Sequence, residues 1–172
     1  MRYHFSLSRF LQRLESGATA VEFVILMPVM MVCFGAIVEG SRIYWNYQGA
    51  VSGVRDATRY LARITPETIC EGVADTSWRA LPGGSTEALA IINRNLGSGS
   101  ANLFPLAVGI NGVTASYSCP DLNLATNPTP IARVQASLDI YLPFGTVFEF
   151  FGRRGTSKLQ STVTDQSRIY GI

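Results

Sequence analysis

The feature that most constrains this chain is an apolar run from Ala18 to Val38 that contains a single charged side chain, Glu22. A helix over this run, rising 1.5 Å per residue, would cover about 30 Å, the thickness of a bilayer's hydrocarbon core. A charged group within a bilayer costs from roughly a few to more than ten kcal/mol, so a carboxylate there calls for a functional reason. We therefore predict a transmembrane helix over residues 18–38 and a role for Glu22.

The segment before the run is short and basic. Residues 1–17 carry three arginines against one glutamate, which predicts that this end faces the cytoplasm, although Arg42 and Arg55 beyond the run weaken the inference. The remainder has eleven basic and eleven acidic side chains and no net charge. Bulk charge therefore gives no reason to expect a nucleic-acid partner.

Other readings of the N-terminus fit less well. A secretory signal peptide needs a small-x-small cleavage site, and residues 32–36 supply none cleanly. A lipoprotein would be cut before Cys33, but Val32 stands where a small residue is required. An uncleaved single-pass anchor remains open, and it leaves Glu22 without an explanation.

The residues around Gly17 resemble a known processing site. A leader ending in Gly17, small residues, and a glutamate five residues on, followed by Phe23 and an apolar helix, are similar to type IV prepilins. From about Arg13 to Ala62 the chain resembles the TadE-like minor pilins, or pseudopilins, of the tight-adherence (Tad, or Flp) pilus system. The residues that carry this resemblance are Ala20-Val21-Glu22-Phe23, Pro28, Phe34-Gly35, Glu39-Gly40, Ser41-Arg42 and Arg55-Asp56-Ala57-Thr58-Arg59-Tyr60.

The resemblance implies how the chain is processed, which partners it has and where it is located. A prepilin peptidase would cut between Gly17 and Ala18, and Glu22 and Phe23 would guide helix pairing during assembly. The expected partners are that peptidase, other pilins and pseudopilins, the inner-membrane assembly platform and membrane lipid. The protein would sit in the inner membrane with its head outside the cytoplasm, or in the pilus, and serve adhesion or secretion.

The helical pattern continues past the membrane. An apolar stripe at alternating steps of four and three residues predicts a packed helix that ends at Thr65-Pro66, where proline excludes helical backbone. We expect one helix of about 45 residues, loosened at Pro28. Gly49 and Gly53 either mark a close helix contact or simply weaken the helix. The stripe comprises Ile43, Tyr47, Ala50, Val54, Ala57, Leu61 and Ile64.

The rest predicts a small α+β head of pilin-like fold, in which the long helix packs on an antiparallel sheet. We expect a helix over residues 87–96, capped by Ser85 or Thr86, and strands over 113–118, 131–142 and 158–168, with the last two paired. The predicted parts are a leader (1–17), a transmembrane helix (18–38) and a head (39–172), whose helical spine covers 39–64. The phenylalanine-rich loop 142–154 is expected to be core, with a subunit or membrane contact as the alternative.

The three cysteines and the scarcity of bases limit the chemistry. Cys70 and Cys119 are expected to form one disulfide in an oxidising compartment, with two free thiols as the alternative, while Cys33 serves as an apolar residue. The only histidine, His4, lies in the leader, and Lys158 is the only lysine. No spacing singles out a pair among the carboxylates Glu67, Glu71, Asp75 and Asp121. We therefore expect no catalytic site, metal or cofactor, and an envelope hydrolase is the least favoured reading.

Overall fold

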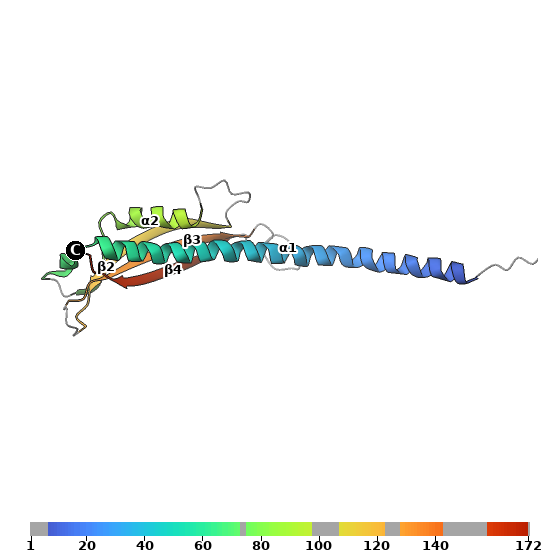
Figure 1. The fold of residues 1–172 in the computed structure, drawn as a ribbon, viewed down its shortest axis with the longest axis horizontal. Coiled ribbons are helices and arrows are strands. Elements are labelled where there is room, and N and C mark those ends of the chain that lie inside the picture. Colours follow the sequence, from blue (N-terminus) through green and yellow to red (C-terminus); the bar gives the residue numbers. More distant parts are fainter. Residues whose placement is uncertain (1–6, 73–74, 98–106, 123–127, 143–157, 172) are drawn as a thin grey trace, which may run out of the picture. The chain divides into compact units, whose positions relative to one another are not determined.

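The computed structural model describes residues 7–72, 75–97, 107–122, 128–142 and 158–171 (Figure 1). Side chains at 7–16, 18 and 19 are not described. The chain divides into two compact units, residues 1–40 and 41–172. Its elements in order are α1 (Leu7–Ile64), the 3-10 helix η1 (Glu67–Cys70), β1 (Asp75–Ala80), α2 (Gly84–Asn95), β2 (Val108–Cys119), β3 (Ile131–Tyr141) and β4 (Lys158–Arg168).

Helix α1 is 58 residues long and therefore starts earlier than the expected helix of about 45 residues. No glycine or proline interrupts the sequence from Leu7 to Ser16, so nothing there opposes helical backbone. The helix continues through Pro28 and ends at Ile64, as the following Thr65-Pro66 predicts. The predicted end is confirmed, and the predicted length is wrong at the N-terminal side.

The four strands form one antiparallel sheet in the order β1-β2-β3-β4. Strands β3 and β4 pair without interruption from Ile131 opposite Arg168 to Tyr141 opposite Lys158, which confirms their predicted pairing. Strand β2 extends well beyond the predicted residues 113–118 and has an irregularity between Ile110 and Gly112. Strand β1 and helix η1 were not predicted. With the long helix, this sheet confirms the α+β fold class.

The spine half of α1 lies along the sheet and buries its apolar stripe there (Figure 1). Strand β3 buries every second side chain from Ala132 to Leu138, as expected for a sheet with one packed face, and Asp139 is buried as well. Ile64 departs from the prediction: it lies beyond the sheet contact and is 52 % exposed. The core comprises Ala50, Val54, Ala57 and Leu61 of α1, Ala88 and Ile92 of α2, and Val108, Ala115, Val134, Ala136 and Leu138 of the sheet.

Helix α2 packs closely against α1 at two glycines. A Cβ at Gly53 would lie 2.9 Å from the Ile92 Cα, and one at Gly49 would lie 3.3 Å from the Asn95 carbonyl oxygen. The close-contact interpretation of these glycines therefore holds. The predicted cap of α2 is wrong: the helix starts after Gly83, whose φ of 72° suits glycine. The Ser85 hydroxyl instead accepts a hydrogen bond from the Ala115 N–H at 3.1 Å, so it fastens the helix to β2.

The end of α1 is tied to the rest of the head by backbone and covalent bonds. The Tyr170 N–H donates to the Ala62 carbonyl at 3.0 Å, and the Glu67 N–H donates to the Gly171 carbonyl at 3.2 Å. Cys70 in η1 and Cys119 at the end of β2 form a disulfide that joins residues 49 apart in sequence. The chain after Pro66 is therefore held against the sheet instead of forming a long loop.

Candidate processing and assembly segment

The predicted cleavage bond, Gly17–Ala18, lies within α1. The backbone is helical on both sides of it, and Gly17 is exposed. A Cβ at Gly17 would meet nothing within 4 Å, so this glycine is not required by packing inside the chain. Packing among the described residues therefore gives no reason for glycine at this position.

Glu22 and Phe23 lie on the surface of α1, and Phe23 is 65 % exposed. Ala18 precedes Glu22 by four residues, a spacing that puts both on one face of a helix. No described part of the chain covers the side chains of Glu22 and Phe23. The structure thus leaves the predicted assembly residues available to another molecule, but it holds no partner for them.

The apolar residues that follow are exposed around the whole circumference of the helix. A helix that is apolar on all sides is stable only when something apolar surrounds it. Among the described residues one helix, Ala20–Ile64, is long and apolar enough to cross a membrane, and its most apolar stretch is not buried within the chain. The exposed side chains are Val21, Phe23, Val24, Ile25, Leu26, Met27, Val29, Met30, Met31, Val32, Phe34, Ile37 and Val38.

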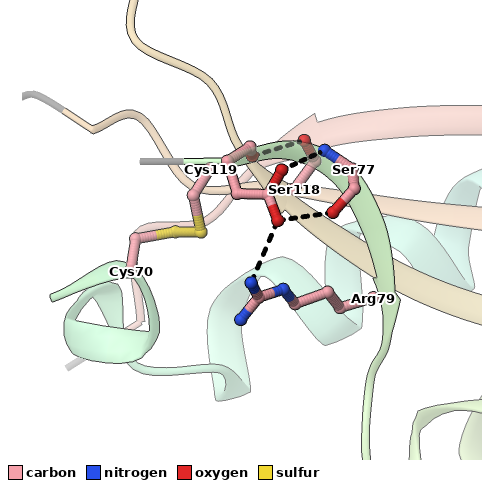
Figure 2. Close-up of polar contacts among 6 residues, drawn as sticks. Cys70, Ser77, Arg79, Ser118 and Cys119 are labelled. Atoms are coloured by element: carbon pink, nitrogen blue, oxygen red, sulfur yellow. Dashed lines mark hydrogen bonds and ion pairs between the residues drawn. A yellow bond between two sulfur atoms is a disulfide. The ribbon is translucent and has the colours of Figure 1, made fainter. Parts of the chain in front are cut away.

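The carboxylate of Asp75 has several polar contacts in the head, and those contacts are local. It accepts hydrogen bonds from the Ser77 N–H at 2.8 Å, the Ser77 hydroxyl at 2.5 Å and the Arg79 guanidinium at 2.9 Å. Dashed lines mark these bonds from the labelled Ser77 and Arg79 in Figure 2. These bonds, those from Ser77 first, lower the pKa of Asp75 to about 2. The Ser118 hydroxyl donates to the Asp75 backbone carbonyl at 3.4 Å, beside the Cys70–Cys119 disulfide. The cluster fixes β1 to β2 and offers no free base.

The only lysine is also engaged. The Lys158 ammonium lies 2.9 Å from the carboxylate of buried Asp139, and this hydrogen bond raises the pKa of the lysine. A raised pKa keeps the amine protonated, which is the opposite of what a catalytic base needs. Over the described residues no group of acidic, cysteine and histidine side chains is arranged to hold a metal ion.

A hollow of about 330 Å³ lies at the end of the spine, between α1, η1 and the start of α2. Its walls are mostly apolar, and Glu87 is the only ionisable side chain among them. A single carboxylate is not a general acid–base pair, so this hollow gives no support to the envelope-hydrolase interpretation. It is lined by Leu61, Ile64, Thr65, Pro66, Ile69, Leu81, Pro82, Gly83, Gly84 and Glu87.

One expected part of the core lies outside the described residues, and one exposed aromatic pair was given no role in the sequence analysis. The phenylalanine-rich segment beyond Leu142 falls outside the described residues, so its expected role in the core stays a prediction. Tyr44 and Trp45, which were given no role, are 62 % and 76 % exposed. The signal that would have singled them out is their position, since two adjacent aromatic residues follow soon after the apolar run ends.

Comparison with known proteins gives a match to a family model. The family model described as TadE-like protein matches residues 17–59, from the glycine of the predicted cleavage bond through most of the spine. Neither a curated protein nor a solved structure matches the chain. The match covers the membrane-type half of α1 and the first part of the head, and it leaves the sheet outside.

Proposed function

Because residues 17–59 are TadE-like, we propose that this protein is a minor pilin, or pseudopilin, that takes part in assembling a Tad (Flp) pilus. The observation that carries the proposal is that the family match begins at Gly17, where the prepilin-type site also lies. The exposed apolar helix supports a membrane-anchored subunit. The engaged Lys158 and the local contacts of Asp75 argue against an enzyme.

Processing is the first step of the proposal. A prepilin peptidase at the cytoplasmic face cuts the Gly17–Ala18 bond and removes the basic leader, residues 1–17. Gly17 is exposed and has no packing role among the described residues. The peptidase therefore reaches the backbone at Gly17, which a larger side chain would cover. The cut leaves a new α-amino group on Ala18 at the start of the apolar run.

Assembly follows from the charge that the cut creates. In the proposed contact, Glu22 of one subunit pairs with the Ala18 amine of a neighbouring pilin. Each charge alone is costly in lipid, and pairing them offsets part of that cost. Phe23 and the exposed apolar side chains beside it pack on the neighbouring helix. The contact therefore favours docking in one register.

The proposed location is the inner membrane, with residues 39–172 as a head on its outer side, or the assembled pilus itself. The disulfide in the head suits such an oxidising compartment. The proposed partners are the prepilin peptidase, other pilins and pseudopilins of the system, the inner-membrane assembly platform and membrane lipid. The resulting pilus serves adhesion or secretion.

The test replaces Glu22 by alanine in cells that make the pilus. The Glu22→Ala protein should insert at least as well as wild type, because an expensive residue is gone, and should still be cut after Gly17. It should fail to support pilus assembly, measured by counting surface pili. Glu71→Ala is the control, because Glu71 is an exposed carboxylate of the head. Normal piliation by a cleaved Glu22→Ala protein would remove the assembly role from this residue.

A second candidate is an uncleaved single-pass anchor that presents the head as a binding domain. One observation favours it: α1 is helical through the Gly17–Ala18 bond, so a peptidase must first unwind that part of the helix. N-terminal sequencing of the protein from piliated cells separates the two. A chain that starts at Ala18 supports the pilin, and one that retains Met1 supports the anchor.

A further inference from the structure

Tyr44 and Trp45 are two adjacent aromatic side chains that project from α1 soon after the apolar run ends. They are 62 % and 76 % exposed, and Trp45 is the most exposed of the large hydrophobic side chains in the described part of the chain. Both belong to the unit of residues 41–172. Burial within its own chain therefore contributes little to the free energy of the Trp45 side chain.

Packing within the head does not account for Trp45. It precedes the fully buried Ala50 by five residues, which puts it about 140° away around a helix of 3.6 residues per turn. It therefore lies on the side of the spine that faces away from the sheet. The other residues on that side are exposed and polar: Ser52, Asp56, Arg59 and Arg63. Trp45 is the exception on this face and stands at the end nearest the apolar run.

We propose that Tyr44 and Trp45 form an interfacial anchor that binds the phospholipid headgroup region and fixes the depth of α1 in the membrane. Trp and Tyr favour this region because an apolar ring and a polar N–H or O–H suit a boundary that is apolar on one side and wet on the other. Trp45 follows Val38, the last residue of the apolar run, by about 10 Å of helix, on the order of the headgroup layer's depth.

Lipid is the occupant that the surroundings favour. The exposed apolar side chains end at Val38, and the five residues after it include Glu39, Ser41 and Arg42, as expected where a helix leaves the hydrocarbon core. Two exposed aromatics that follow such a stretch in the same helix are typical of the boundary between lipid and water. The inference rests on the membrane anchoring in the proposed function and does not depend on the pilin role. It adds a site that sets how far the helix is inserted.

The chain offers a matched experiment because it has two tryptophans. Trp78→Phe leaves Trp45 as the only indole, and Trp45→Phe leaves Trp78, which is 41 % exposed on the head and lies beneath the Arg133 guanidinium at 5.0 Å. Each full-length variant is reconstituted into phosphatidylcholine–phosphatidylglycerol vesicles. Fluorescence quenching is measured with aqueous iodide, with lipids that carry a nitroxide near the headgroup, and with lipids that carry it near the chain end.

We expect Trp45 to be quenched most by the headgroup nitroxide, less by the chain-end nitroxide and least by iodide. Trp78 should be quenched by iodide alone. Quenching of Trp45 by iodide as strong as that of Trp78 would overturn the inference. Shielding of Trp45 from all three quenchers would also overturn it, because that result would mean that protein and not lipid covers the pair.

The depth-setting role has its own readout at Cys33. Cys33 is the only thiol outside the disulfide, so a spin label on it reports the depth of the apolar helix. Tyr44→Ser together with Trp45→Ser should shift the mean depth of this label or broaden the distribution of its depths. Tyr60→Ser, which removes another exposed aromatic of α1, should leave the depth unchanged.

The outcomes at Cys33 separate the two proposals. An unchanged depth in the double variant would overturn the depth-setting role. A label that is reached by water in the wild type would overturn the membrane anchoring and this inference together. A lipid-embedded label combined with a water-exposed Trp45 would overturn only the interfacial anchor.

Discussion

At Gly53 the backbones of α1 and α2 come so close that only a hydrogen fits. A Cβ there would lie 2.9 Å from the Cα of Ile92, a backbone atom that cannot turn aside. Gly53→Ala should therefore lower the free energy of unfolding of the head by about 1–3 kcal/mol, in spite of alanine's better helix propensity. Urea unfolding in detergent, followed by near-UV circular dichroism, measures the effect.

The control for Gly53 lies on the same helix. A Cβ at Gly40 would meet nothing within 4 Å, so Gly40→Ala should leave the head's unfolding midpoint at or above that of wild type. Equal midpoints for the two variants would contradict the close packing of α1 and α2 at Gly53.

Asp75 gives a prediction for pH. Hydrogen bonds from Ser77 and then Arg79 hold its pKa at about 2, below the usual 3.8. A depressed folded-state pKa stabilises the head above about pH 4, and this contribution is lost as the pH falls through 2. An NMR titration of the Asp75 carboxyl should show the low pKa in wild type and a pKa nearer 3.8 in Ser77→Ala. An unchanged titration in Ser77→Ala would exclude the hydrogen bond from the Ser77 hydroxyl as a cause of the low pKa.

At the scale of single elements, the sequence revealed those whose side chains follow a period. Strands β3 and β4 were found because apolar and polar residues alternate along β3 and, more weakly, along β4. Strand β1 was missed because it is a short edge strand, and all of its residues after Asp75 are exposed, so no alternation marks it. The start of α2 was misplaced because Ser85 looks like a cap but its hydroxyl bonds to β2.

The disulfide is the element-scale link that can be tested directly. Cys70→Ser with Cys119→Ser should lower the free energy of unfolding by about 4 kcal/mol in the chain-entropy model, because the bridge joins residues 49 apart. Alkylation of denatured wild type without reductant should label Cys33 alone. Labelling of all three cysteines without reductant, in protein from the oxidising side of the membrane, would show that Cys70 and Cys119 are not bridged.

For the whole molecule, the proposed processing predicts a mass. Gly17→Val should block the peptidase and leave a protein about 2 kDa heavier, because the leader is retained. Gly35→Val is the control, since a Cβ at Gly35 also meets nothing within 4 Å, and it should be cut normally. Intact-mass measurement after membrane extraction reads out both. A wild-type mass that still includes Met1 in piliated cells would end the pilin interpretation.

The fold class of the whole molecule was predictable because it depends on two strong patterns, the long helix and the β3–β4 pair. For the candidate site, the sequence indicated which residues to consider, but the chain alone does not show what those residues contact. Gly17, Glu22 and Phe23 lie exposed on α1, and their roles depend on molecules that the chain does not contain. Tyr44 and Trp45 could have been singled out by their position after the apolar run, but only the structure shows that Trp45 lies away from the packed face of its helix.

The order of the strands also bears on how the head is made. Each strand pairs with the next one along the chain, so no strand has to wait for a distant segment before it finds its neighbour. If the head crosses the membrane in chain order from residue 39 onward, the sheet grows in the order in which the strands emerge, while the membrane already holds the preceding part of α1. After the last strand, Tyr170 and Gly171 bond back to Ala62 and Glu67 and tie the end of the chain to the end of α1. The end of translocation and the completion of the head would then be the same event.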